Sequence, residues 1–75
     1  MNKGDILYYA RVLPGIYDVC ELKVRTIGDD YFVGVDKRDK HAYLLPYSYL
    51  DIKVFKDRED ALEIVRKEES ENEEE

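Results

Sequence analysis

YFVGVDKRDKHAYLLPYSYLDI, residues 31–52, contains two runs of strand-forming residues separated by a charged loop. The first run extends from Tyr31 to Asp36 and the second from His41 to Leu45, and their composition predicts the two strands of a hairpin. Pro46 has no backbone N–H to donate to a sheet. We therefore predict that the second strand ends before this proline and that a single helical turn follows over residues 46–49.

Two further strands are predicted upstream of this hairpin. Residues 6–13 are rich in strand formers, and both alternating sets of their side chains are largely apolar, which leaves open the face that is buried. Pro14 and Gly15 then occupy the second and third positions of a turn. Because proline fixes φ and glycine accepts a positive φ, this pair predicts a type II turn.

The next strand, residues 17–27, has a cleaner alternation. Cys20, Leu22 and Val24 fall on one face and charged residues fall on the other, as in a half-buried antiparallel strand. Cys20 is accordingly predicted to be a core residue and not a reactive thiol, because apolar burial raises the pKa of a thiol. In the hairpin that follows, Gly34 predicts a bulge, a sharp bend or a close backbone approach.

A short strand near residues 52–55 and one helix complete the predicted elements. Asp57 can cap the helix, which continues into the apolar patch of Ala61, Leu62, Ile64 and Val65. We predict that the helix ends at Lys67, because EESENEEE has no apolar side chain and its like charges oppose helix. The expected organisation is a single domain over residues 1–67 and a disordered Glu-rich tail over residues 68–75.

The acidity of the chain is concentrated at its C-terminal end. Residues 1–56 contain nine Lys and Arg against eight Asp and Glu, whereas residues 57–75 contain three against ten, which together account for the net charge of −6. A negative field opposes phosphate binding, so direct nucleic-acid binding is disfavoured. The basic loop of Lys37, Arg38 and Lys40 is interpreted as an ordinary solvated turn.

The composition also bears on chemistry and location. One cysteine and one histidine, His41, provide no set of metal ligands. No nucleophile is paired with a base, so neither a cofactor nor an enzymatic activity is expected. No run of residues has the length of a signal or membrane-spanning segment. We expect a cytoplasmic protein that does not contact the membrane.

Five short strands and one capping helix predict a small antiparallel β-barrel. Asp30-Tyr31-Phe32 and the segment YLLPYSYL, residues 43–50, resemble the second half of an SH3-like barrel. In such domains an acidic residue and an aromatic pair open a strand, and a strand, a proline, a helical turn and a tyrosine end the domain. One extra residue precedes Pro46 relative to that pattern. The expected fold is mainly β, a five-stranded antiparallel SH3-like barrel with one C-terminal α-helix.

A second resemblance spans residues 4–65. GDILYY at residues 4–9, the strand that ends at Ile27, and VFKDREDA at residues 54–61 are similar to small uncharacterised SH3-like barrel proteins of Gram-positive bacteria and their phages. Those proteins have a GD-x-V-Y opening and a V-F-x-T-x-E-E-A start to the final helix. The resemblance implies the same fold and a bacterial or phage source.

The aromatic content indicates a protein-binding module. The chain has seven tyrosines and no tryptophan, and tyrosine suits interfaces because it combines a large apolar body with a polar tip. The same tyrosines also have to fill the core. The resemblance to SH3-like domains implies an aromatic face that docks extended peptides of another protein. The candidate face comprises Tyr8, Tyr9, Tyr31, Phe32, Pro46 and Tyr49.

The alternative function is that of an acidic inhibitor that mimics nucleic acid. Its carboxylates would occupy the phosphate channel of a host nuclease or defence complex, whereas the plainer interpretation of the same charges is a solubilising tail. Exposed strand edges leave the oligomeric state open between a monomer and a small homo-oligomer. The acidic tail residues are Glu68, Glu69, Glu71, Glu73, Glu74 and Glu75.

Overall fold

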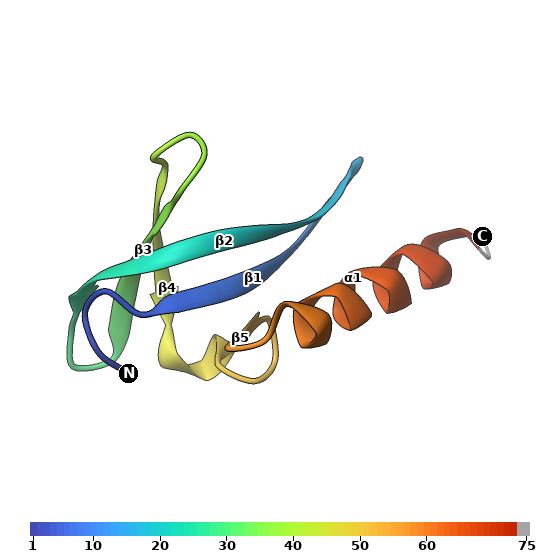
Figure 1. The fold of residues 1–75 in the computed structure, drawn as a ribbon. Helices are drawn as coiled ribbons and strands as arrows, with labels where there is room; N and C mark the ends of the chain where they lie inside the picture. Colours follow the sequence, from blue (N-terminus) through green and yellow to red (C-terminus); the bar gives the residue numbers. More distant parts are fainter. Residues whose placement is uncertain (74–75) are drawn as a thin grey trace.

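The computed structural model describes residues 1–73, which form one five-stranded antiparallel sheet and one C-terminal helix (Figure 1). The strands lie in the order β4-β3-β2-β1-β5. The predicted mainly β fold with five strands and a C-terminal helix is therefore confirmed. In chain order the elements are β1 (Ile6–Leu13), β2 (Ile16–Ile27), β3 (Tyr31–Asp36), β4 (Ala42–Pro46), the 3-10 turn η1 (Tyr47–Tyr49), β5 (Val54–Phe55) and α1 (Arg58–Glu73).

The sheet is not closed into a barrel. In the described part of the chain, β4 and β5 form its two edges and are not paired with one another. In Figure 1 the β1–β2 hairpin runs across the direction of β3 and β4, which shows that the sheet is strongly twisted. The structure thus shows an open antiparallel sheet, and the SH3-like barrel stays a prediction.

The strand boundaries follow the sequence patterns closely. Leu13 pairs with Ile16 across the first turn, and Gly15 has a φ of 79°, as the predicted type II turn requires. The strand β4 begins one residue later than predicted and includes Pro46. A proline is tolerated there because β4 is an edge strand.

The strand β1 is buried on both faces, which explains why neither of its alternating sets is polar. Leu7 is 3% exposed and packs in a core cluster with side chains from each of the other strands. Ala10 is 1% exposed and packs on the opposite face against Ala61 and Val65 of α1. We call the side of Leu7 the inner face of the sheet and the side of Ala10 its outer face.

The predicted inward residues of β2 are confirmed in the inner core. Cys20, Leu22 and Val24 are each at most 2% exposed. A Cβ atom built on Gly34 would lie 3.0 Å from the Leu22 Cβ, so this glycine provides a close approach, one of the three predicted alternatives. The β-bulge lies on β2, where the register with β3 shifts between Val24 and Thr26.

The helix α1 begins after Asp57, as predicted. Glu59 and Asp60 lie in its first turn, where their charges suit the positive end of the helix dipole. The helix packs against β1, β2 and β5, and its buried residues Ala61 and Val65 provide the contact with the outer face. The apolar patch recognised in the sequence is therefore the surface that attaches the helix to the sheet.

The helix extends beyond its predicted end at Lys67 and continues to Glu73. The predicted disordered tail therefore has no support in residues 68–73. Helix nucleation is the costly step, and it is complete once the first turns are packed on the sheet. Glutamate has a high helix propensity and so extends an existing helix readily. Glu74 and Glu75, the end of the predicted tail, lie outside the described residues.

Candidate functional site

The six residues predicted to form one binding face lie in different parts of the molecule. Tyr8 packs on the outer face with the residues that contact α1, whereas Tyr9 lies on the inner face. Phe32 is 0% exposed in the inner core, so it is not accessible to a partner. These three residues therefore do not form a common surface.

Of the other three predicted residues, Tyr31 and Pro46 are cross-strand partners, whereas Tyr49 lies in another element. Tyr31 opens β3 and its ring lies beside Gly28, and Pro46 ends the edge strand β4. Tyr49 lies in η1 and packs against the inner core, as Tyr9 does. Of the six predicted residues, Tyr31 pairs with Pro46 across β3 and β4, and Tyr9 and Tyr49 both pack against the inner core.

Four aromatic side chains form a row on the inner face, which we call the aromatic row: His41, Tyr43, Tyr9 and Tyr49. The ring centroids of His41 and Tyr43 are 4.6 Å apart and those of Tyr43 and Tyr9 are 5.7 Å apart, both in edge-to-face arrangements. Tyr49 packs against the same inner core cluster as Tyr9 and Tyr43. Lys53 places its Nζ 5.1 Å from the centroid of the Tyr49 ring, a distance typical of a cation–π contact.

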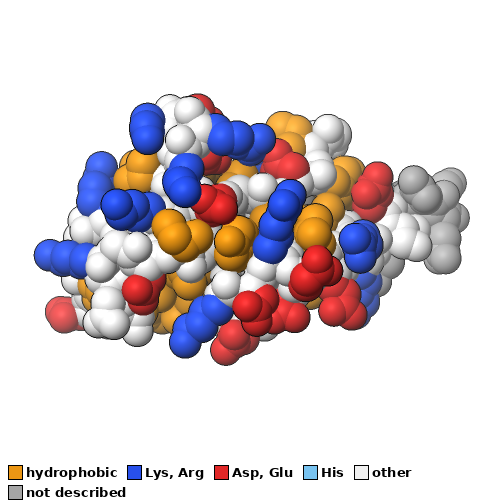
Figure 2. Space-filling view, viewed as in Figure 1, with side chains coloured by type: hydrophobic (Ala, Val, Ile, Leu, Met, Phe, Trp, Pro, Cys, Tyr) orange, Lys and Arg blue, Asp and Glu red, His pale blue; other side chains and the backbone are white. Residues whose placement is uncertain are grey.

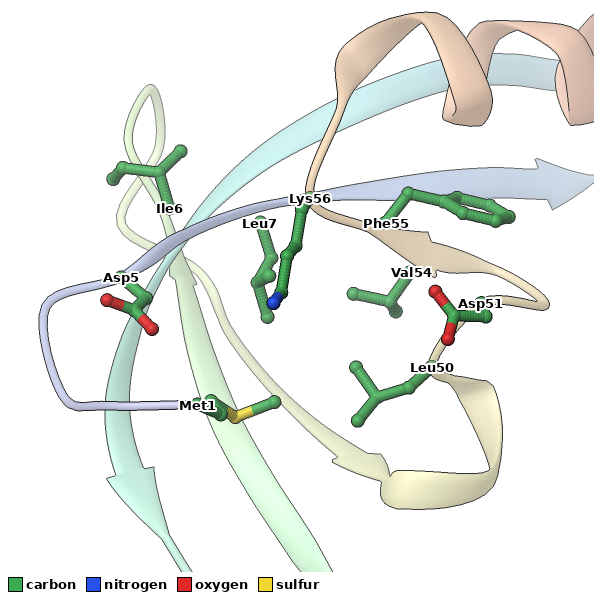
Figure 3. Close-up of a pocket in the computed structure, with 9 residues that line it drawn as sticks. All are labelled: Met1, Asp5, Ile6, Leu7, Leu50, Asp51, Val54, Phe55 and Lys56. Atoms are coloured by element: carbon green, nitrogen blue, oxygen red, sulfur yellow. The ribbon is translucent and has the colours of Figure 1, made fainter.

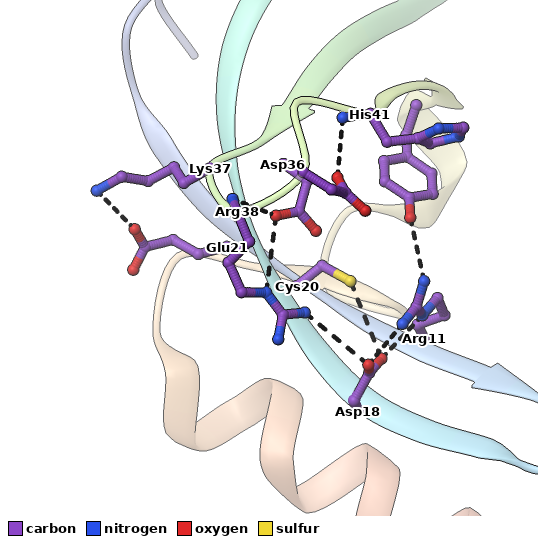
Figure 4. A network of polar contacts seen from close by, with 10 residues as sticks. Arg11, Asp18, Cys20, Glu21, Asp36, Lys37, Arg38 and His41 are labelled. Atoms are coloured by element: carbon purple, nitrogen blue, oxygen red, sulfur yellow. Dashed lines mark hydrogen bonds and ion pairs between the residues drawn. The ribbon is translucent and has the colours of Figure 1, made fainter.

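Arg11 connects the aromatic row to the sheet (Figure 4). Its Nε donates to Asp18 Oδ1 at 2.8 Å and its Nη2 donates to Asp18 Oδ2 at 2.6 Å. Its Nη1 donates to the Tyr43 hydroxyl at 3.2 Å. The hydrogen bond with Asp18 raises the pKa of Arg11. The bidentate pair fixes the plane of the guanidinium group, so Arg11 holds the Tyr43 ring in one orientation.

The hydroxyls of Tyr9 and Tyr43 remain protonated at neutral pH, because the pKa of each is raised. Burial, followed by the charges of Tyr49 and Tyr43, raises the pKa of Tyr9. Burial also raises the pKa of Tyr43. These two phenols are thus neutral groups that can donate and accept a hydrogen bond.

A buried carboxylate, Asp36, lies in the same polar network (Figure 4). It is 2% exposed; its Oδ1 accepts a hydrogen bond from the Arg38 backbone N–H at 2.7 Å and lies 3.8 Å from Arg38 Nε. Burial alone raises the pKa of Asp36, but the hydrogen bond and charge of Arg38, together with hydrogen bonds from Cys20 and the Asp39 backbone, outweigh burial, and the pKa is lowered. Cys20 is fully buried beside this network, and burial raises the pKa of its thiol.

The basic loop after β3 is paired with acidic side chains. Lys37 Nζ lies 2.8 Å from Glu21 Oε2, and Arg38 Nη2 lies 4.0 Å from Asp18 Oδ2. In Figure 2, Lys and Arg side chains are spread mainly over the strands and their loops, and Asp and Glu gather along the side where α1 runs. These ion pairs agree with the interpretation of the loop as a solvated turn.

A pocket of about 500 Å³ opens at the N-terminal end of β1 (Figure 3). Leu7, Leu50 and Val54 supply apolar surface, while Asp5 and Asp51 lie at opposite sides of the pocket. Small-molecule sites usually place several polar groups around one point, and these two carboxylates do not converge. The pocket adjoins the aromatic row, because Val54 pairs with Tyr9, and it extends the apolar surface available there.

Three members of this site, His41, Tyr43 and Arg11, are not among the predicted site residues. Alternation along the strand places His41 and Tyr43 on the same face as the core residue Leu45, which is a signal available in the sequence. Arg11 interrupts an otherwise apolar alternating set in β1. The pairing of β1 with β5, which brings η1 next to Tyr9, has no comparable local signal.

Comparison with protein-family models, with curated proteins and with solved structures found no match. Within residues 1–73, no group of three His, Cys, Asp or Glu side chains is arranged to hold a metal ion. In the same part of the chain, no helix has the length and apolar character needed to span a membrane.

Proposed function

We propose that this protein is a non-catalytic protein-binding module that contacts another protein through the aromatic row. The observation that carries the proposal is that rings from β1, β4 and η1 pack against the same inner core, with the Tyr9 and Tyr43 rings in contact. Tyr9, Tyr43 and Tyr49 are half-buried and His41 is exposed. Each ring is therefore held in place by the protein while part of its surface faces the solvent.

The chemistry of the row matches that of protein interfaces. Tyrosine and arginine are enriched among the residues that dominate binding energy; the row contains three tyrosines, of which Tyr43 contacts Arg11 and Tyr49 contacts Lys53. Arg11 is already fixed by Asp18, so little side-chain entropy is lost when a partner binds. The resemblance to SH3-like proteins of bacteria and phages supports the same function by analogy.

Replacing Tyr43 or Tyr49 with alanine is expected to weaken partner binding at least tenfold. Each substitution removes a ring from the row, and truncation of a central interface tyrosine typically costs 1–2 kcal/mol or more, where about 1.4 kcal/mol is tenfold. A partner isolated by affinity capture with the wild-type chain would be titrated calorimetrically against each variant. Circular dichroism would establish that the variants are folded.

Tyr31→Ala is the matched control for this experiment. Tyr31 is half-buried like the tyrosines of the row but lies beside Gly28, so its removal should leave the affinity unchanged. Equal affinity of the wild-type chain and folded Tyr43→Ala would refute the aromatic row as the contact surface. Loss of binding in Tyr31→Ala alone would favour the surface predicted from the sequence.

A second candidate function, an acidic mimic of nucleic acid, is supported by the length of α1. The helix continues through residues 68–73, and a helix spaces its residues regularly at about 1.5 Å each along its axis. Carboxylates on a helix form a more ordered anionic surface than those of an unstructured tail. Exposed acidic residues of the described helix include Glu59, Asp60, Glu63, Glu68 and Glu69.

Truncation after Lys67 tests this second function. If the acidic helix occupies a phosphate channel, the truncated chain should lose most of its inhibition of a target nuclease in an activity assay, because it lacks six of the ten acidic residues of segment 57–75. A matched variant with the same length and Gln in place of those Glu residues separates charge from length. Full inhibition by the truncated chain would exclude the helix end as the mimic.

A further inference from the structure

The edge strand β4 has an unusual composition for a strand with a free side. Its sequence is Ala42-Tyr43-Leu44-Leu45-Pro46 and contains no charged residue. Leu44 is 68% exposed, more than any other large hydrophobic side chain in the part of the chain that the structure describes. Natural proteins usually protect edge strands with charges, because an edge is a template for pairing with another strand. Apart from its terminal proline, β4 lacks this protection.

The hydrogen-bond pattern shows which backbone groups face the open side. The Asp36 N–H donates to the His41 carbonyl, and the Tyr47 N–H donates to the Asp30 carbonyl. In an antiparallel pair, hydrogen-bonded positions alternate with non-hydrogen-bonded ones. The intervening residues Ala42, Leu44 and Pro46 therefore direct their backbone groups away from β3. Of these three, Ala42 and Leu44 have an N–H that can donate to an added strand.

We infer that the β4 edge is a homodimer interface, in which β4 pairs antiparallel with β4 of a second copy about a twofold axis at Leu44. In this register each Leu44 exchanges both backbone hydrogen bonds with Leu44 of the other copy. Each Ala42 N–H donates to the opposite Pro46 carbonyl. The missing N–H of proline ends the ladder at this position, so the uncharged segment is also the segment that pairs.

The side chains favour the same register. Leu44 lies opposite Val33 on the outer face, and pairing about the twofold axis covers its exposed side chain with the same leucine of the other copy. A strand that pairs with itself must avoid like charges at opposed positions, and β4 has no charge to oppose. The aromatic rows of the two copies then lie on the same face of a sheet that is continuous across the dimer.

The position of the acidic helix also favours β4 over the other edge. The helix α1 packs on β1, β2 and β5, and β4 and β5 lie at opposite edges of the sheet. Pairing through β5 would bring together two segments that each carry ten acidic and three basic residues. Pairing through β4 keeps these like charges apart, which reduces their repulsion.

The test is the oligomeric state of the full chain together with cysteine cross-linking. Sedimentation equilibrium of the wild-type protein should show a dimer that dissociates on dilution. Leu44→Lys places two like charges opposite one another and should raise the dimer dissociation constant at least tenfold. Leu44→Cys should form a disulfide-linked dimer under oxidation, because directly opposed Cα atoms about 5.5 Å apart lie within the range of disulfides.

Ile52 provides matched controls, because it is 61% exposed and lies outside β4. Ile52→Lys should dimerise as the wild type does, and Ile52→Cys should not cross-link. Native Cys20 is buried, so the wild-type chain should give no linked dimer. A wild-type chain that is monomeric at all concentrations would overturn the inference, as would a dimer unaffected by Leu44→Lys. A monomer whose β4 is protected from hydrogen exchange only when a different protein binds would also overturn it.

Discussion

Phe32→Ala is expected to lower the free energy of unfolding by about 3–5 kcal/mol, the range measured for removing a buried aromatic ring from a core. Phe32 is 0% exposed and its ring stacks on Tyr47 with centroids 6.0 Å apart. A 75-residue chain has a total stability of roughly 4–11 kcal/mol. The substitution should therefore unfold a large part of the population, which urea denaturation followed by circular dichroism would measure.

The control for this prediction is Ile52→Ala, a truncation at a side chain that is 61% exposed. It should change the stability by no more than about 0.5 kcal/mol. The comparison also decides between a structural role and a binding role for Phe32. A Phe32→Ala variant with wild-type stability and no partner binding would show that its ring is a surface contact.

Asp36→Asn is expected to lower the free energy of unfolding at pH 7 by about 1.5–3 kcal/mol, the usual contribution of a hydrogen bond to a charged group. The pKa of Asp36 in the folded protein is lowered from its ordinary value of 3.8. A carboxyl group with a lowered folded-state pKa stabilises the fold above its unfolded-state pKa, and this contribution is lost as the pH falls through the folded-state value. The difference between wild type and variant should therefore shrink below about pH 3.8.

Urea denaturation at several pH values between 7 and 2 would measure this dependence. Asp29→Asn serves as the control, because Asp29 is an exposed carboxylate in the turn before β3, and a surface substitution should change the stability by no more than about 0.5 kcal/mol. A constant difference between wild type and Asp36→Asn across the whole range would mean that ionisation of Asp36 does not contribute. The stabilisation would then arise from packing alone.

The local patterns of the sequence predict the strands well because each depends on neighbouring residues. The period of two places Cys20, Leu22 and Val24 in the core, and the proline–glycine pair predicts the first turn. The buried face of β1 stays undecided in the sequence for a physical reason. Both of its faces are covered, one by the inner core and one by α1. Neither alternating set of side chains is therefore polar, and the sequence cannot indicate which set faces the core.

The helix end and the site depend on contacts that local patterns do not contain. The like charges of residues 68–73 oppose helix, but the first turns of α1 are anchored on the sheet, and the helix continues to Glu73. Tyr8 and Tyr9 are adjacent in sequence and both aromatic, but consecutive strand residues point to opposite faces. A set of aromatic residues chosen by type therefore mixes the two sides of the sheet. Only the three-dimensional structure shows that Tyr9, Tyr43 and Tyr49 pack against the same core.

The contact between Tyr9 and Tyr43 also shows that the sheet is strongly curved between β1 and β4. These residues belong to β1 and β4, which are separated by β2 and β3. In a flat sheet, strands three positions apart lie roughly 14 Å from one another, yet the ring centroids are 5.7 Å apart. Both side chains extend from their strands into the concave side of the sheet, so their rings lie closer together than the strands do. The edge-to-face contact therefore depends on the curvature of the sheet. If the sheet became flatter, the two rings would separate before any strand pairing is lost.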